Sequence, residues 1–212
     1  MKKIFFLTAL LISGGIVITS FKTSVQEPLE VVPAQSKTAA AKWTLDKSHS
    51  NVKFTVTHMV VSEVDGSFKT FDATMEGSKP DFSDAKVMFT VDVASVDTDN
   101  ERRDNHLKGD DFFNSEKFPQ MKFESSSFKS LGNNKYELKG DLTIRDITKP
   151  VTFEATHLGN TTDRGKVKAG FKATAKVNRF DYNLKWDRAT EAGSLVVAKE
   201  ITINLNAAFV QQ

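Results

Sequence analysis

Histidine is both a frequent metal ligand and a general base, but it is scarce and widely spaced here. The four histidines are His49, His58, His106 and His157. No two of them have the HExxH spacing or another close spacing of metal ligands. His49 and His58 are nine residues apart, so one regular strand would place their side chains on opposite faces. We therefore expect no bound metal, and we interpret the histidines as hydrogen-bonded groups at strand ends.

Nucleophilic chemistry has equally little support in the sequence. Asp46, Ser48 and His49 lie close together along the chain, but a catalytic triad is defined by geometry and not by adjacency. The chain has no GxSxG elbow and no glycine-rich phosphate loop. It also has no cysteine, which excludes disulfides, thiolate metal sites, thiol catalysis and an acylated lipoprotein cysteine. These absences predict a protein that is not an enzyme and that uses no cofactor.

One charged cluster, Arg102-Arg103-Asp104, could bind an anionic head group through a guanidinium fork. The same cluster could equally be the solvated face of a short helix. The formal net charge of the chain is only +2, and without Lys2 and Lys3 the 29 − 2 = 27 basic residues would balance the 27 acidic ones. The aromatic residues do not alternate with a basic stripe. We therefore expect no nucleic-acid partner.

The first 42 residues differ in composition from the rest of the chain. Lys2 and Lys3 precede an apolar run that extends to Phe21, which is typical of a secretory signal peptide. An uncleaved membrane anchor is the alternative for residues 1–21, because the run is close to the ~18 residues that a spanning helix needs. Residues 22–42 contain two prolines and no sustained periodicity, so we expect a flexible linker there. Both readings predict a periplasmic or otherwise exported protein, tethered to the membrane if the signal is not cleaved.

From Trp43 onward the dominant pattern is a period of two, which predicts strands with one apolar and one wet face. Clear alternation covers residues 52–56, 87–93, 136–144, 151–155, 167–177 and 201–209. Two further strands are less regular. One changes phase near Lys69-Thr70, which suggests a bulge, and one begins after Pro119, where a proline is tolerated. The sequence therefore predicts about eight strands.

Turn residues and one helical segment lie between these strands. The turns are Lys79-Pro80-Asp81, Gly132-Asn133-Asn134 and Asp163-Arg164-Gly165. Residues 99–111 are charged and do not alternate, and Asp99 or Asn100 could cap a short helix that ends before Gly109.

Eight strands with short connections favour an antiparallel meander that closes into a barrel or packs as two sheets. The small residues Ala169, Ala173 and Ala175 share one face of their strand and leave room beside the phenylalanines. They favour a barrel with a cavity, although the same residues could pack a dry sandwich.

Several stretches together resemble the YceI-like family of lipid- or polyisoprenoid-binding proteins. They are WTLDKSHSNVKFTVTHMVVSEVDGSF, VDTDNERRDNHLKGDDFFNSEKFPQMKFES, LKGDLTIRDITKPVTFEA and VNRFDYNLKW. The resemblance covers residues 43–209. It implies an all-β fold: an eight-stranded antiparallel lipocalin-like barrel with one short helical insertion, exported to the periplasm and without catalytic residues. It places a barrel domain at residues 43–210.

The sequence departs from the family pattern at two turns, where Asp146 and Asn183 replace the usual glycines. Because Asp and Asn tolerate a left-handed backbone better than other non-glycine residues, we expect both turns to be retained.

The resemblance also implies a long polyisoprenoid, quinone-type or fatty lipid in the barrel lumen, held for transport or storage. By alternation phase, the lumen candidates are Val52, Phe54, Phe68, Phe89, Phe123, Leu142, Phe153, Phe171 and Ile203. Arg103 and His106 are candidates for contacts with the head group or the barrel mouth, although Arg103 and Asp104 could instead fasten the helix to the barrel. A membrane-associated partner and a homodimer remain open. The alternative function is an exported, non-catalytic interaction or stress-response module with a filled barrel.

Overall fold

A computed structural model of the chain describes residues 40–212. The predicted signal peptide or anchor, residues 1–21, and nearly all of the predicted linker lie outside the described residues. The first strand, β1 (Ala41–Leu45), already includes the last two linker residues, so the folded domain begins slightly earlier than predicted. No helix among the described residues has the length and apolar character needed to cross a membrane.

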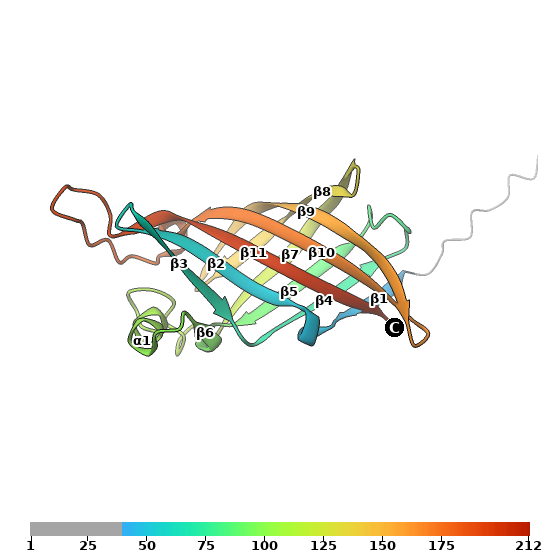
Figure 1. The fold of residues 1–212 in the computed structure, drawn as a ribbon, viewed down its shortest axis with the longest axis horizontal. Helices are drawn as coiled ribbons and strands as arrows, with labels where there is room; N and C mark the ends of the chain where they lie inside the picture. The colour runs from blue at the N-terminus through green and yellow to red at the C-terminus, as the bar shows by residue number, and fades with distance from the viewer. Residues whose placement is uncertain (1–39) are drawn as a thin grey trace, which may run out of the picture. The chain divides into compact units, whose positions relative to one another are not determined.

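The described chain forms a closed eight-stranded antiparallel barrel with one α-helix (Figure 1). This confirms the predicted fold class. The remaining strands are β2 (Asn51–His58), β3 (Ser62–Phe68), β4 (Phe71–Gly77), β5 (Lys86–Asp92), β6 (Val96–Asp97), β7 (Gln120–Gly132), β8 (Lys135–Ile144), β9 (Ile147–Asp163), β10 (Lys166–Asn178) and β11 (Val197–Gln211). The pairing of β1 with β11 closes the barrel.

The eleven strands form only eight strand positions around the barrel, because three of these positions are each occupied by two consecutive strands. β1 and β2 both pair with β11 and are separated by the short 3₁₀ helix η1 (Lys47–His49). β5 and β6 are separated in the same way by η2 (Val93–Ser95). The third interruption separates β3 from β4 at Lys69-Thr70, where the sequence changes phase. There the backbone N–H groups of Lys69 and Thr70 donate to the backbone oxygen and to Oγ of Ser95, at 3.1 and 3.0 Å.

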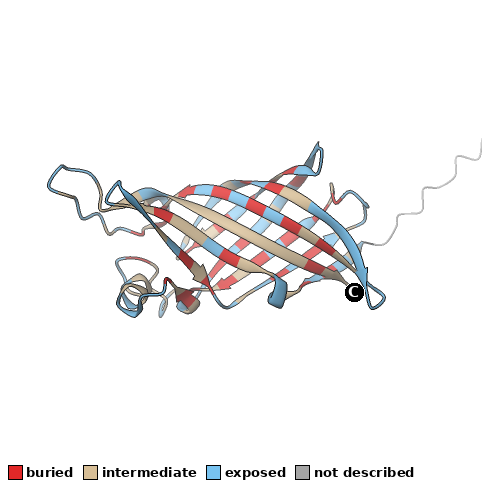
Figure 2. Cartoon of the chain, viewed as in Figure 1, coloured by how far each residue is buried: buried red, intermediate tan, exposed pale blue. Residues whose placement is uncertain are grey.

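The period of two in the sequence becomes an alternation of buried and exposed residues along several strands, which Figure 2 shows most clearly on β10. Two glycines in the sheet, Gly66 on β3 and Gly140 on β8, leave space for aromatic rings of the neighbouring strands. A Cβ atom on Gly66 would collide with the ring of Phe54 on the paired strand β2. A Cβ atom on Gly140 would collide with the ring of Phe123 and with the backbone oxygen of Glu124. The rings therefore cross positions that only glycine leaves open.

The helix lies where the sequence predicts it, at α1 (Glu101–Lys108). Asn100 caps it, since its Oδ1 accepts from the backbone N–H of Arg103 at 3.0 Å, and Gly109 follows the last turn. Of the two capping candidates, Asn100 is therefore the correct one.

Two turns follow the expected chemistry. Asn133 and Asn134 both have positive φ between β7 and β8, and Asn183 is left-handed after η3 (Arg179–Tyr182). In the turn between β8 and β9, however, the residue with positive φ is Arg145, at 57°, and not Asp146. The turn survives the loss of glycine, but the left-handed position is one residue earlier than predicted.

Candidate functional site

The barrel encloses a cavity of about 190 Å³, which is far larger than the ~10–15 Å³ that one water molecule requires. Every strand except β1 and β6 contributes to its wall, and the exposed wall is almost wholly apolar. Along β11 the lining residues extend from Val197 to Phe209, which is about 40 Å of strand at ~3.3 Å per residue. The site is therefore long and apolar, and its wall has almost no polar atoms that could bind water.

All nine lumen candidates line this cavity. They are Val52, Phe54, Phe68, Phe89, Phe123, Leu142, Phe153, Phe171 and Ile203. The structure thus brings them together from eight strands around the barrel, and their role in binding a ligand stays a prediction. Sequence reasoning missed part of the wall, because Leu107, Phe112, Phe113 and Leu184 also line the cavity from outside the strands. The only signal for them was the adjacent pair Phe112-Phe113 in the stretch that resembles the family.

One end of the barrel is filled by side chains. The ring of Phe82, in the loop between β4 and β5, lies 5.5 Å from Trp43 and 5.2 Å from Phe171, between ring centroids. The hydroxyl of Tyr136 donates to the backbone oxygen of Asp81 at 2.8 Å, which fastens this loop to β8. Trp43, Phe82 and Tyr136 are buried, yet none of them lines the cavity. The cavity therefore stops short of this end.

Because this end is filled, two alanines on the same face of β10 have different surroundings, although alternation predicts that both face the lumen. Ala169 is 1% exposed and does not line the cavity, whereas Ala173, four residues further along the same face of β10, does. Only Ala173 therefore leaves space in the lumen.

The opposite end is covered by the segment that follows α1. Phe112 and Phe113 line the cavity from this segment, and Leu107 lines it from the last turn of α1. Arg145 fastens it: Nη1 donates to the backbone oxygens of Asp110, Phe112 and Asn183, each at 2.9 Å, and Nη2 pairs with Asp110 Oδ1 at 2.8 Å. These bonds tie the covering segment to the β8–β9 turn.

A second arginine, Arg179, is 2% exposed and contributes to the cavity wall. Its guanidinium donates to the backbone oxygens of Ala198, Leu184 and Val197 at 3.0, 2.8 and 3.0 Å. Burial lowers the pKa of the guanidinium from its usual value, and the three carbonyl oxygens compensate for lost hydration. Arg179 therefore fastens the chain after η3 to the start of β11.

The two head-group candidates lie outside the cavity. Arg103 donates to Oγ1 and to the backbone oxygen of Thr98, both at 2.7 Å, and Asp104 Oδ1 accepts from the same threonine. These contacts correspond to the alternative in which the pair fastens the helix. The exposed ring of His106 contacts Asp111 Oδ2 at 2.9 Å and packs edge-on against Phe112. Neither Arg103 nor His106 lines the cavity.

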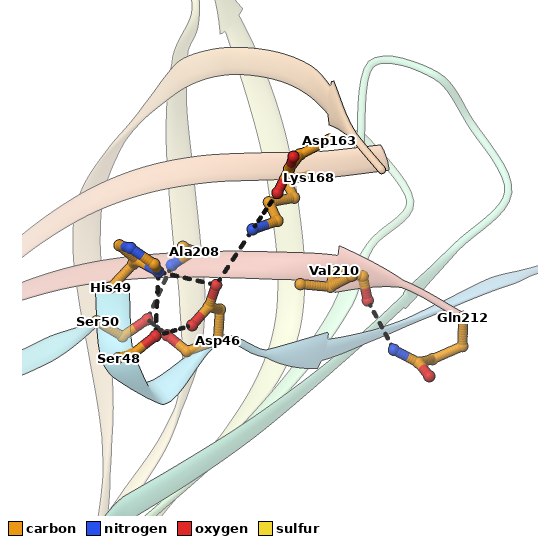
Figure 3. Close-up of polar contacts among 9 residues, drawn as sticks. All are labelled: Asp46, Ser48, His49, Ser50, Asp163, Lys168, Ala208, Val210 and Gln212. Atoms are coloured by element: carbon orange, nitrogen blue, oxygen red, sulfur yellow. Dashed lines mark hydrogen bonds and ion pairs between the residues drawn. The ribbon is translucent and has the colours of Figure 1, made fainter. Parts of the chain in front are cut away.

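Asp46, Ser48 and His49 do contact one another, but not as a catalytic triad (Figure 3). Ser48 Oγ and Asp46 Oδ2 lie 3.1 and 2.9 Å from the same ring nitrogen, His49 Nδ1, whereas a triad uses both ring nitrogens. The hydrogen bonds from Ser48 and His49 lower the pKa of Asp46 to about 2.

This cluster serves the corner between β1 and β2. The Asp46 backbone N–H donates to the Ala208 oxygen at 2.7 Å, and the Ala208 N–H donates to Ser50 Oγ at 2.9 Å. The corner thus satisfies the backbone of β11 where its pairing changes from β1 to β2. Among residues 40–212 there is also no group of three His, Asp or Glu side chains that could hold a metal ion.

Comparison with known proteins places the chain in a family. The model of the YceI-like domain matches residues 43–209, so the chain belongs to the YceI-like family. UPF0312 protein SA2479 of Staphylococcus aureus is 38% identical over 170 residues, covering 79% of this chain and 96% of that protein.

Solved structures agree with this assignment. The YceI protein of Campylobacter jejuni is 32% identical, with a TM-score of 0.64 over 80% of this chain and 97% of that chain. A polyisoprenoid binding domain from Saccharophagus degradans shares the fold at 12% identity, with a TM-score of 0.57 over 80% of this chain and 98% of that chain.

Proposed function

We propose that this protein is an exported carrier that holds one long-chain lipid, such as a polyisoprenoid, a quinone-type lipid or a fatty chain, in its barrel lumen. The observation that carries the proposal is the cavity itself, which is about 190 Å³, long, and almost wholly apolar. Membership of the YceI-like family and the polyisoprenoid-binding neighbour of the same fold support it.

The energetics of the cavity favour an apolar chain over water or an empty space. An unfilled apolar cavity costs about 24 cal/mol per Å³, or about 5 kcal/mol for this volume. Each methylene group that moves from water into the lumen contributes about 0.8 kcal/mol. A chain of many carbons can therefore bind firmly without polar contacts, which the wall hardly offers. Because Phe82 fills one end, we infer that the polar head group remains near the end covered by α1 and its following segment.

The test is native mass spectrometry of the purified full chain, followed by organic extraction of whatever accompanies it. The proposal predicts an added mass that extraction identifies as a long-chain isoprenoid, quinone or fatty lipid. A long polyprenol added to delipidated protein should restore that species, whereas its short analogue farnesol should bind more weakly because it buries fewer methylene groups. A clean apo mass, together with no uptake of the polyprenol, would refute the proposal.

A further inference from the structure

The turn between β2 and β3 presents three consecutive apolar side chains to solvent. Met59, Val60 and Val61 are 49%, 67% and 88% exposed. Single exposed apolar residues are ordinary on protein surfaces, but a contiguous group often marks an interaction site. None of the three contributes to the core or to the cavity wall, so their apolar character has no role inside this domain.

The backbone of this turn is strained, because Val60 is the one β-branched residue among the described non-glycine residues with positive φ. Met59 and Val60 have φ of 51° and 68°. Positive φ is a rare outlier for a β-branched residue such as Val60. At the β7–β8 hairpin the two positive-φ positions are instead Asn133 and Asn134, which accept this conformation readily. The β2–β3 turn thus carries a valine where asparagine or glycine would relieve strain, and such strain commonly accompanies function.

The turn directly adjoins the cavity. Val52, Phe54 and Val56 of β2 line the lumen, and the final pair of that strand joins His58 to Val197, which also lines it. The Met59 backbone N–H then donates to the oxygen of Val196 at 2.7 Å. Figure 1 shows the turn at the same end of the barrel as α1, and therefore away from the end that Phe82 fills.

We propose that Met59, Val60 and Val61 form a membrane-docking turn that inserts into the surface of a lipid bilayer beside the cavity mouth. Three side chains cannot supply the ~800 Å² per partner that a stable protein interface buries, but they suffice for shallow insertion into a bilayer. The charges beside the turn are mixed: Glu63 and Asp65 on β3 are acidic, whereas Lys199 on β11 and Arg188, whose backbone oxygen accepts from the Val196 N–H, are basic. Insertion is therefore driven by apolar burial, and the surface it fits is an uncharged, zwitterionic one.

The inference rests on the proposed lipid binding for its purpose, but its test does not require a loaded lumen. Because the chain contains no cysteine, Val61→Cys provides a unique site for a polarity-sensitive fluorophore on the full chain. Leu131→Cys is the matched control, because Leu131 is 60% exposed and precedes the β7–β8 turn at the other end of the barrel. With phosphatidylcholine vesicles, the label at position 61 should brighten and shift to the blue, while the label at 131 should not respond.

A second variant, Val60→Asn, separates docking from folding. It removes an apolar side chain and also relieves the backbone strain, so it should lower the vesicle partition coefficient of the Val61→Cys protein about tenfold. Its melting temperature should be equal or higher.

Equal responses of the labels at 61 and 131, or unchanged partitioning of the Val60→Asn variant, would overturn the proposal. So would a dimer that forms without vesicles and dissociates on Val60→Asn, because the turn would then contact a second copy. If the turn does not dock but mass spectrometry finds a bound lipid, the docking proposal is refuted and the proposed lipid binding stands.

Discussion

Enlarging Ala173 tests whether the space inside the barrel is a binding site. Ala173 lines the cavity and is paired with Ala155 on β9 and Leu205 on β11, both of which also line it. Ala173→Leu should place its added carbons in the lumen without displacing a neighbour. Filling an existing cavity commonly stabilises a protein by about 0.5–2 kcal/mol, so the ligand-free variant should be at least as stable as the wild type.

The same carbons should exclude part of the ligand. If the added leucine carbons displace about three methylene groups, the lost burial is about 3 × 0.8, or about 2.4 kcal/mol. This loss corresponds to a dissociation constant raised about 50-fold. The expected signature is therefore a weaker binder that unfolds at equal or higher urea concentration, a combination that damage to the fold cannot produce.

Titration of the delipidated full chain with a fluorescent long-chain fatty acid measures the affinity, and urea unfolding measures the stability. Ala169→Leu is the control, because Ala169 is buried on the same face of β10 but lies beyond the cavity. That variant should lose about 1–3 kcal/mol from overpacking, with little change in the affinity of the folded fraction. Equal affinities of Ala173→Leu and wild type, or equal destabilisation by the two substitutions, would refute the assignment of the lumen.

Three other features of the barrel give measurable expectations. The pKa of Asp46 is lowered to about 2, so its ionised carboxylate stabilises the fold above the unfolded pKa of ~3.9, and this stabilisation is lost as pH falls toward 2. In Asp46→Asn, the free energy of unfolding in urea should therefore depend less on pH between about pH 4 and pH 2. Arg179→Lys cannot reach three diverging carbonyl oxygens, and it should lower the free energy of unfolding by about 3 kcal/mol; a loss below about 1 kcal/mol would contradict the fastening role. Gly140→Ala must displace the backbone of Glu124 and should cost about 1–3 kcal/mol of stability. The three atoms nearest to a Cβ on Gly66 all belong to the movable ring of Phe54, so Gly66→Ala should cost less stability but weaken binding of the fatty-acid probe.

Features that depend on local chemistry could be predicted from the sequence. The helix of residues 101–108 has its signals within one turn at each end, Asn100 and Gly109, and both act as expected. The strands can be predicted equally well, because a half-buried strand requires apolar and polar residues to alternate with a period of two. The change of phase at Lys69-Thr70 was visible as well, but its form was not, because the interruption depends on hydrogen bonds with Ser95, which is distant in sequence.

The distinction between a lumen and a core was not accessible from the pattern. Alternation determines that Ala169 and Ala173 face inward, but not what lies opposite each of them. Phe82, which lies in a loop outside any alternating segment, packs against Phe171 at one end of the barrel. The side chain of Ala173 instead faces the cavity. A cavity is the difference between the volume enclosed by the backbone and the volume of the side chains within it, and both depend on closure of the barrel. The same phenylalanines could therefore form a dry core or a binding site, and the position of one loop ring decides where the site begins.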